Sequence, residues 1–435
     1  MKKVLIITYY WPPAGGIGVH RCLKFAKYLR EFGWEPIIYT ADGADYAYKD
    51  ETNFKDIQEG ITVLRKKIVE PFRLFKFFSG RKKDDPSNPV YVRSKKGGFI
   101  DVFSIWLRGN FFIPDAKCLW IRPSVRYLST YLRENKVDAI LTDGPPHTNT
   151  VIGCKLSQKF NIPWLADFQD PWTQVDYYKM FHILPWADKK HKRMEQEVFA
   201  TAKKITIASP TWGKDLERIG AKHVSPVFWG FDEDDFRSNS PELDTDFTIT
   251  HAGLLGFDRK PDTLFRVLKD LKNELPEFGQ MLKLNFAGVV DFSVKDELKE
   301  NGLLENFVEF GNIPRPQALE LTRKAQILFL PLNIADNAKG RIPGKLFEIL
   351  RAHRPVLCLG PKESDVETII TKTNSGECIE YSDYDALKAF ILEHYNAYMK
   401  GENVIHQKDI STYSVRNQVK KIGGYLDLIS TSEKK

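Results

Sequence analysis

The sequence predicts an α/β protein built from two doubly wound, Rossmann-like domains that face a cleft. Three observations predict this fold class. Short apolar runs alternate with amphipathic stretches along the chain, which is typical of parallel sheets covered by helices. The 435 residues exceed what one ordinary core accommodates. An acidic, turn-rich stretch at residues 231–246 separates two halves of similar size and indicates a linker.

Each half contains six apolar runs that we expect to form strands. In the first half these are residues 4–10, 35–41, 61–67, 138–144, 163–170 and 203–210. In the second half they are residues 247–253, 282–290, 308–313, 326–332, 354–360 and 376–381. Helical spacing of apolar residues between them, as in VHRCLKFAKYLREFG and PDTLFRVLKDLKNEL, predicts the covering helices. The expected domains are residues 1–235 and 246–411, followed by a C-terminal helix and tail at 412–435.

Composition excludes several classes of protein. The net charge of +7 is modest for this length, and no apolar stretch approaches the roughly 20 residues that span a bilayer. The five cysteines are widely spaced and include no CxxC pair, so we expect neither a zinc site nor a disulfide framework. This cysteine usage favours a reducing, cytoplasmic compartment. The first apolar run is only about seven residues long and leads into PPAGG, which predicts a buried strand rather than a signal peptide.

Residues 65–96 break the alternation and begin an insertion over about residues 65–125. They contain eleven Lys or Arg residues against three acids, interleaved with four phenylalanines. Two interpretations remain open: an exposed insertion without a specific role, or a surface that docks on anionic lipid headgroups. RNA binding would use the same residue types, but no RNA-binding module is recognisable, so we expect no nucleic-acid partner.

The first loop, YYWPPAGGIGVHR, lies between a predicted strand and a predicted helix. A dinucleotide-binding GxGxxG motif beginning at Gly16 would require glycine at position 21, where Arg21 stands. Gly15 and Gly16 remain, and glycines at a strand-to-helix turn allow an anion to approach the backbone amides. A plain tight turn is the alternative.

Polar side chains follow two further strands of the first half. His147 stands behind two prolines at the end of the strand DAILTDG, where either a structural or a functional histidine is possible. Asp167 and Asp170 end the strand PWLADFQD and could form an acid–base pair, although two carboxylates alone are weak evidence for a metal site. The run DEDD at 232–235 lies in the predicted linker, so we interpret it as solvated charge.

The second half offers two basic loops. In HAGLLGFDRKPDTL, Arg259 and Lys260 precede a predicted helix, and two cations there suit a diphosphate; a solvated basic pair is the alternative. In GRIPGKLFEIL, residues 340–350, the spacing is one residue short of a Walker loop, and Leu346 replaces the hydroxyl residue that would hold magnesium. Lys345 and Glu348 share one helix face, as an ordinary surface pair or as ligands for phosphate and ribose hydroxyls.

Together these motifs resemble retaining glycosyltransferases of the GT-B fold, specifically glycosyltransferase family 4. The resemblance rests on PPAGGIG, GPPH, ASPTWGKDL before WGFD, HAG followed by RKP, and PGKLFEILRAHRPVL, in this order over nearly the whole chain. DFQDPW is similar to an element of members that build bacterial envelope polysaccharides. The fold implied is GT-B, with the C-terminal helix returning to the N-terminal domain.

The resemblance implies a role for each candidate residue. Catalytic roles are implied for His147, Arg259 and Lys345. Donor-binding roles are implied for Gly15, Gly16, Lys260, Ile313, Gly344 and Glu348. Asp167 and Asp170 are expected on the acceptor side. The partners implied are a nucleotide-diphosphate sugar and a glycan or lipid-linked acceptor, with a peripheral position at the inner membrane face and with neither a cofactor nor a metal required.

Two positions depart from the family pattern. Glu348 matches the second glutamate of the E-x7-E element, but Gly340 stands where the first would bind the sugar. Leu254 replaces an arginine, which moves the phosphate-binding charge to Arg259 and Lys260. Two alternatives to a retaining glycosyltransferase therefore stay open: a GT-B-fold sugar-nucleotide epimerase, and a non-catalytic paralogue that binds glycan or lipid.

Overall fold

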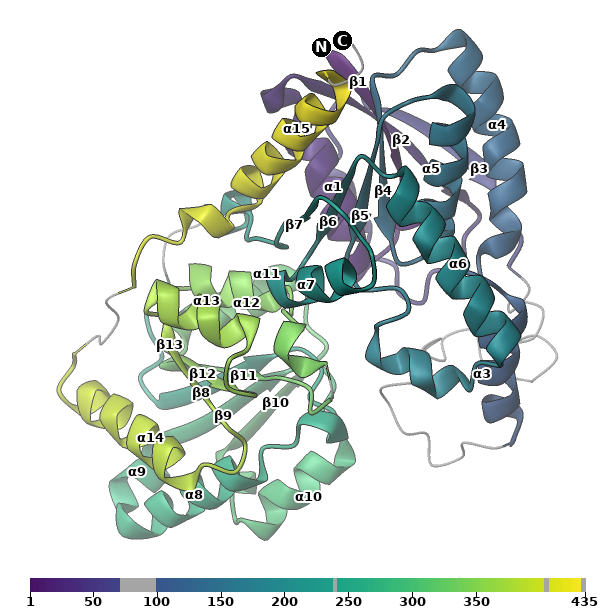
Figure 1. The fold of residues 1–435 in the computed structure, drawn as a ribbon. Coiled ribbons are helices and arrows are strands. Elements are labelled where there is room, and N and C mark those ends of the chain that lie inside the picture. Colours follow the sequence, from purple (N-terminus) through teal and green to yellow (C-terminus); the bar gives the residue numbers. More distant parts are fainter. Residues whose placement is uncertain (71–98, 238–240, 336, 403–406, 432–435) are drawn as a thin grey trace. The chain divides into compact units, whose positions relative to one another are not determined.

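The structure, a computed structural model, describes residues 1–70, 99–237, 241–335, 337–402 and 407–431. They form two compact units (Figure 1). Unit 1 comprises Met1–Trp229 together with Val415–Lys435, and unit 2 comprises Gly230–Ser414. Most of the predicted basic segment falls within residues 71–98, which lie outside the described residues, so its proposed lipid-docking role stays a prediction.

Unit 1 is built on a seven-stranded parallel sheet with strand order β3-β2-β1-β4-β5-β6-β7. The strands are β1 (Lys2–Ile7), β2 (Trp34–Asp42), β3 (Thr62–Lys67), β4 (Ala139–Gly144), β5 (Trp164–Phe168), β6 (Lys204–Ile207) and β7 (Val224–Pro226). Each of the six predicted runs of this half overlaps a strand. The short β7 was not predicted, because three residues are too few to show a period of two.

Helices cover both faces of this sheet, because both sets of alternating side chains on its strands are apolar. The helices of unit 1 are α1 (Ile17–Tyr28), α3 (Phe99–Phe111), α4 (Ile121–Glu134), α5 (His147–Phe160), α6 (Pro185–Thr201), α7 (Pro210–Arg218) and α15 (Val415–Thr431). In β1, Leu5 and Ile7 join the core beneath α4 and α5. Val4 and Ile6 point the other way, into the core beneath α1 and α15.

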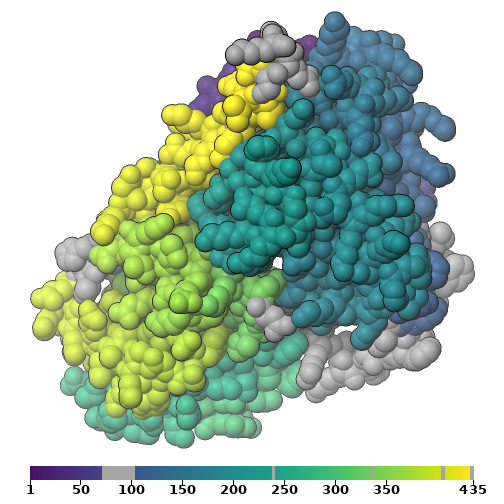
Figure 2. Space-filling view, in the orientation of Figure 1, coloured from purple at the N-terminus to yellow at the C-terminus, as the bar shows by residue number. Residues whose placement is uncertain are grey.

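The C-terminal helix α15 returns to unit 1, as predicted. Val419, Ile422 and Leu426 recur at helical spacing along it and are buried in the same core cluster as α1. In the space-filling view the helix, in yellow, lies directly on the surface of unit 1 (Figure 2). Arg416 of α15 also forms a surface ion pair with Glu31, at 2.7 Å.

Unit 2 repeats the architecture with a six-stranded parallel sheet of order β10-β9-β8-β11-β12-β13. Its strands are β8 (Phe247–Ala252), β9 (Leu282–Ala287), β10 (Phe307–Gly311), β11 (Ile327–Pro331), β12 (Val356–Leu359) and β13 (Gly376–Ile379). Its helices are α8 (Asp262–Glu274), α9 (Pro276–Met281), α10 (Phe292–Glu300), α11 (Arg315–Lys324), α12 (Lys345–Arg351), α13 (Asp365–Thr373) and α14 (Tyr384–Met399). The predicted fold class, two doubly wound parallel sheets, is therefore confirmed.

The carboxyl ends of the strands carry most of the candidate residues in both units. In unit 1, Gly16, His147 and Asp170 follow the carboxyl ends of β1, β4 and β5. In unit 2, the loops after β8 and β11 lead to Arg259 and Lys345. Loops at this edge converge because the strands are parallel, which is why open α/β sheets bind ligands there. No helix of the described residues is long and apolar enough to cross a membrane.

Candidate functional site

Lys345 begins α12, and its partly buried side chain lies against the end of β8. Its Nζ lies 3.3 Å from the carbonyl oxygen of Ala252 and 3.4 Å from Nε2 of His251. The Nδ1 of His251 lies 3.0 Å from the carbonyl oxygen of Phe329. Because a carbonyl only accepts, Nδ1 carries the proton and Nε2 presents a lone pair toward Lys345.

Electrostatics make this lysine sensitive to a ligand. Burial, and after it the positive charge of Arg259, lower the pKa of Lys345 to about 7. Burial also lowers the pKa of His251 well below its usual value, so this imidazole is neutral. Lys345 is thus an amine whose protonation depends on how much negative charge stands beside it.

Gly253 makes room for this arrangement. Its φ is 128°, and an added Cβ would lie 3.1 Å from Nζ of Lys345. A side chain at this position would be strained and would crowd the amine, so glycine is required directly after β8. Gly344 precedes Lys345 as the N-cap of α12 with ordinary helical angles, φ −57° and ψ −32°.

Glu348 lies one turn along α12 and is held by Arg315 at the start of α11. The Nη2 and Nε of Arg315 donate to Oε1 of Glu348 at 2.5 and 3.1 Å. The Nη1 of Arg315 forms an ion pair with Asp235 at 2.9 Å. Glu348 keeps 29% of its side chain exposed, so one carboxylate is both oriented and accessible.

The prediction that the run 232–235 is solvated charge was wrong for two of its four residues, Asp232 and Asp235. The Asp235 side chain is only 5% exposed and pairs with Arg315. Asp232 is buried and accepts a hydrogen bond from the backbone N–H of Asp234, capping the short helix η5 (Glu233–Phe236). The sequence pattern is that of linker charge, but Asp235 is shielded from solvent beside Arg315 at the start of α11.

Arg259 ends the short helix η6 (Phe257–Arg259) and is oriented by its neighbour. Its Nε and Nη2 donate to the two carboxylate oxygens of Asp258 at 3.1 and 3.0 Å. The amide of Asn333, beyond the end of β11, also donates to Asp258. The guanidinium is mostly buried, and its positive charge contributes to lowering the pKa of Lys345.

The remaining donor-side candidates of unit 2 lie around this cluster. Lys260 forms ion pairs with Asp262 at 3.2 Å and with Glu297 at 2.9 Å, so its charge is already engaged by two carboxylates. Ile313 is partly exposed in the loop between β10 and α11, two residues before Arg315. Gly340 ends the short helix η8 (Ala338–Gly340) and is buried.

In unit 1, glycine suits the two positions of the first loop for different structural reasons. A Cβ on Gly15 would lie 2.2 Å from the ring of Tyr48, and its N–H donates to the Tyr48 carbonyl at 2.9 Å. Gly16, the N-cap of α1, has φ 78° and open space around it. Gly15 is therefore needed for packing, whereas Gly16 leaves the start of α1 open to an approaching group.

His147 is the first residue of α5 and is buried as a neutral imidazole. Its ring stacks on Trp172 with centroids 4.6 Å apart, and burial lowers its pKa to about 3. Its Nδ1 is buried without a hydrogen-bond partner among the described residues. Asp115 anchors the helix start by accepting from the N–H and the hydroxyl of Thr148, both at 2.8 Å.

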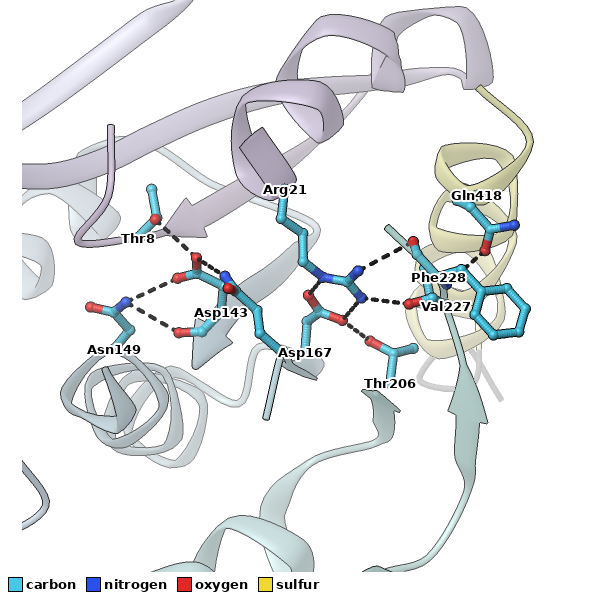
Figure 3. Close-up of polar contacts among 10 residues, drawn as sticks. Thr8, Arg21, Asp143, Asn149, Asp167, Thr206, Val227, Phe228 and Gln418 are labelled. Carbon is cyan, nitrogen blue, oxygen red and sulfur yellow. Dashed lines mark hydrogen bonds and ion pairs between the residues drawn. The ribbon is translucent and has the colours of Figure 1, made fainter. Parts of the chain in front are cut away.

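Asp167 is part of a buried ion pair with Arg21 (Figure 3). Arg21 Nε and Nη2 donate to its two oxygens at 2.5 and 2.7 Å, and Thr206 donates to Oδ1 at 2.5 Å. Although burial acts to lower it, the Asp167 carboxylate raises the pKa of Arg21. Both oxygens of Asp167 are therefore bound by buried side chains of unit 1, which is a structural arrangement. Asp170, two residues beyond β5, is partly exposed.

A second buried carboxylate, Asp143, lies beside this pair at the end of β4 (Figure 3). It accepts hydrogen bonds from Thr8 at 3.1 Å, Asn149 at 2.9 Å and Gln169 at 3.1 Å. Burial, and among other effects the nearby charge of Asp167, raise its pKa to about 7. Asn149 also donates to the Asp143 carbonyl, so this network fixes the loop that carries His147.

Sequence reasoning missed several of these residues. His251 and Asp143 stand in predicted strands, and Arg315 lies two residues beyond the run 308–313, but nothing local identifies their partners, which lie up to 135 positions away. Asp143 was the easiest of the three to predict as a site residue, because it stands directly before GPPH and a carboxylate at the end of a central strand is buried. Among the described residues, no group of three or more His, Cys, Asp or Glu side chains is placed to hold a metal ion.

Comparisons with known proteins identify the fold. No protein-family model matches the chain, and no curated protein matches it. Solved structures do match over its full length. HepE from Anabaena, in complex with UDP, is 12% identical with a TM-score of 0.57 and covers 100% of this chain and 98% of its own. TarM from S. aureus, in complex with UDP, is 12% identical with a TM-score of 0.54 and coverages of 100% and 98%.

A structure described as a putative UDP-N-acetylglucosamine 2-epimerase, from Listeria monocytogenes, matches similarly. It is 10% identical with a TM-score of 0.55, and the match covers 100% of this chain and 97% of that one. At these identities the likeness concerns the fold. The chain has the GT-B fold, which the order of its motifs predicted.

Proposed function

We propose that the protein is a glycosyltransferase that moves a sugar from a nucleotide-diphosphate donor to a glycan or lipid-linked glycan, with retention of anomeric configuration. We place this reaction in the assembly of a cell-surface polysaccharide, at the cytoplasmic face of the membrane. The observation that carries the proposal is in unit 2. There, a partly buried lysine with a lowered pKa, a fixed arginine and an oriented glutamate gather around the carboxyl ends of β8 and β11.

Each of these side chains suits one part of a nucleotide-diphosphate sugar. Lys345 and Arg259 supply positive charge for the diphosphate, and a diphosphate would in turn favour the charged form of Lys345. Glu348, held at Oε1 by Arg315, accepts hydrogen bonds from vicinal ribose hydroxyls. Support also comes from HepE and TarM, which share the fold and were solved with UDP.

The proposed catalysis is electrostatic. Negative charge grows on the diphosphate as its bond to the sugar breaks, so fixed cations stabilise the transition state more than the ground state. In unit 1, we assign a catalytic role to His147, donor binding to the open start of α1 at Gly16, and the acceptor side to Asp170 near the end of β5. The neutral His147 is suited to hydrogen bonding with a sugar hydroxyl and not to carrying positive charge.

One specific observation favours a second candidate, a sugar-nucleotide epimerase. Gly340 leaves the position of the first glutamate of the E-x7-E element without a carboxylate, and epimerases are among the structures with the same fold. An epimerase would change its donor without any acceptor, whereas a transferase requires one.

A thermal-shift screen of nucleotide sugars tests the proposal. Ligand at about 100 times its dissociation constant adds roughly 2.7 kcal/mol to the unfolding free energy, enough to identify the base and the sugar. Stabilisation of the wild type that is lost in Lys345→Met and Glu348→Gln supports the proposal. Equal stabilisation of both variants, or no stabilisation by any nucleotide, contradicts it.

A further inference from the structure

Unit 1 carries large apolar side chains that solvent reaches on α3, on the neighbouring short helix η4 (Asp176–Phe181) and at the start of α6. We call this set the aromatic face. Its members expose between 36% and 55% of their surface and are Phe103, Phe111, Met180, Leu184 and Trp186. Half-exposed side chains of this size are common singly, but a continuous group of them marks an interaction surface.

The rings of the aromatic face form one continuous row together with the partly exposed ring of Trp106. Phe103 stacks on Trp106 with ring centroids 5.8 Å apart. Trp106 meets Phe111 edge to face at 5.7 Å, and Phe111 meets Trp186 of α6 at 5.6 Å. The row therefore crosses from α3 to α6, two helices that lie side by side in unit 1 (Figure 1).

Buried hydrogen bonds hold this row in place. Asn110 of α3 is fully buried, and its amide donates to the carbonyl oxygen of Trp106 at 2.8 Å. Its Oδ1 accepts from the backbone N–H of Leu184 at 2.7 Å. A single amide thus fixes the end of α3 against the loop before α6, so the aromatic face is preformed.

Positive charge borders the aromatic face on α6. Lys189, Lys190 and Arg193 follow Trp186 at spacings of three, four and seven residues, which places them on the same side of the helix. All three are exposed, and none forms an ion pair with a described acid. A helix start that combines an exposed tryptophan with a stripe of cations is amphipathic in the way that interfacial segments are.

We propose that the aromatic face docks unit 1 on the surface of an anionic lipid bilayer. Phenylalanine and tryptophan would enter the boundary between headgroups and acyl chains, where their rings are favoured. The cations of α6 would lie at the level of the lipid phosphates. The cationic border favours an anionic bilayer over another protein as the partner. An apolar groove on a protein could bury the rings, but it would not require cations beside them.

The aromatic face is also connected to the candidate site of the same unit. Trp172, which stacks on His147, donates from Nε1 to Nδ1 of His191 at 3.0 Å. His191 Nε2 lies 3.3 Å from the carbonyl oxygen of Gly109 in α3. Two hydrogen bonds and one stacked pair therefore join α3 to His147. The docking proposal rests on the surface itself and stands or fails independently of sugar transfer.

Co-sedimentation with vesicles tests the aromatic face. The full chain is mixed with vesicles of phosphatidylcholine alone or of phosphatidylcholine with phosphatidylglycerol. We expect binding to the anionic vesicles, and at least about a tenfold weaker affinity for the double variant Phe111→Ser with Trp186→Ser. Phe292→Ser with Phe310→Ser, an equally exposed pair in unit 2, is the matched control and keeps the wild-type affinity. Unchanged thermal unfolding shows that the variants fold.

Charge reversal tests the cationic border separately. The double variant Lys189→Glu with Lys190→Glu is expected to weaken binding to anionic vesicles by at least about fivefold for each lysine. The control, Lys214→Glu with Lys222→Glu on the surface of unit 1, should change this binding little. Three results would overturn the proposal. They are equal binding of the aromatic double variant, self-association of the chain through the aromatic face without lipid, and binding lost only when Arg81, Lys82 and Lys83 are replaced.

Discussion

Arg315 donates two hydrogen bonds to the same oxygen of Glu348, Oε1, at 2.5 and 3.1 Å. The other oxygen, Oε2, has no hydrogen bond to a described residue. Glu348 is therefore fixed in direction without being saturated, which is what a carboxylate that receives ribose hydroxyls requires. Asp235 shares the guanidinium of Arg315, so the stretch that precedes the unit 2 sheet contributes to the orientation of the candidate donor site.

Replacing Arg315 tests this relationship. Arg315→Met leaves the carboxylates of Glu348 and Asp235 without their shared cation, so the unfolding free energy should fall by about 2 kcal/mol or more. Urea denaturation measures it. Lys324→Met breaks the exposed ion pair with Glu320 on the same helix and is the matched control, which should change stability little. Equal effects of the two variants would show that Arg315 does not hold the carboxylates.

The pH dependence of nucleotide binding tests Lys345. Its pKa of about 7 in the free protein should rise when a diphosphate binds, so binding takes up a proton. UDP affinity should therefore fall as pH rises above 7, by up to about tenfold per pH unit. Calorimetry in buffers of different ionisation enthalpy measures the proton uptake directly.

The range above about pH 7 avoids the second phosphate ionisation of UDP, whose pKa is near 6. Lys345→Met should bind UDP more weakly and without this slope. Lys260→Met is the control that keeps the slope, because Lys260 is paired with two carboxylates that raise its pKa. A wild-type affinity that does not vary with pH would remove Lys345 from the phosphate site.

The buried pair of Arg21 and Asp167 should be important for stability. Arg21→Met leaves an unpaired buried carboxylate and should lower the unfolding free energy by about 3–5 kcal/mol. Adding Asp167→Leu should recover part of the loss, since the uncompensated charge is then gone. The exposed pair of Arg416 and Glu31 gives the control variant Arg416→Met. If Arg21→Met were as stable as the wild type, Asp167 would be available for the acceptor-side role that the sequence suggests.

Asp143 should make the stability of unit 1 depend on pH. Its folded-state pKa of about 7 lies above the unfolded value near 3.9, so its contribution is complete below about pH 4 and is lost as pH rises through 7. Relative to Asp143→Asn, the wild type should lose up to about 1.4 kcal/mol per pH unit between these limits. Denaturation curves from about pH 5 to about pH 8 measure the difference, with the surface change Asp138→Asn as control. Parallel curves for wild type and Asp143→Asn would contradict the buried-carboxylate assignment.

The twelve predicted strands and the covering helices were accessible from the sequence because each depends on local apolar periodicity, whereas the return of α15 was implied only by the resemblance to the GT-B fold. The candidate site was accessible only where a motif places a residue after a strand, as with His147, Arg259 and Lys345. Arg315 and Asp235 were missed because an ion pair over 80 positions leaves no local pattern. Asp167 was expected on the acceptor side, since the sequence shows a carboxylate at a strand end but does not show that Arg21 occupies it.

The central claim is that the protein transfers a sugar from a nucleotide-diphosphate donor. The most direct measurement follows a label in the sugar of the donor identified by thermal shift, with and without a membrane lipid extract as the source of acceptor. We expect the label to move to a product of the extract with the anomeric configuration of the donor, and to remain on an unchanged nucleotide sugar when no acceptor is present. Conversion of the donor without any acceptor would identify an epimerase, and an unchanged donor in both reactions would contradict the account.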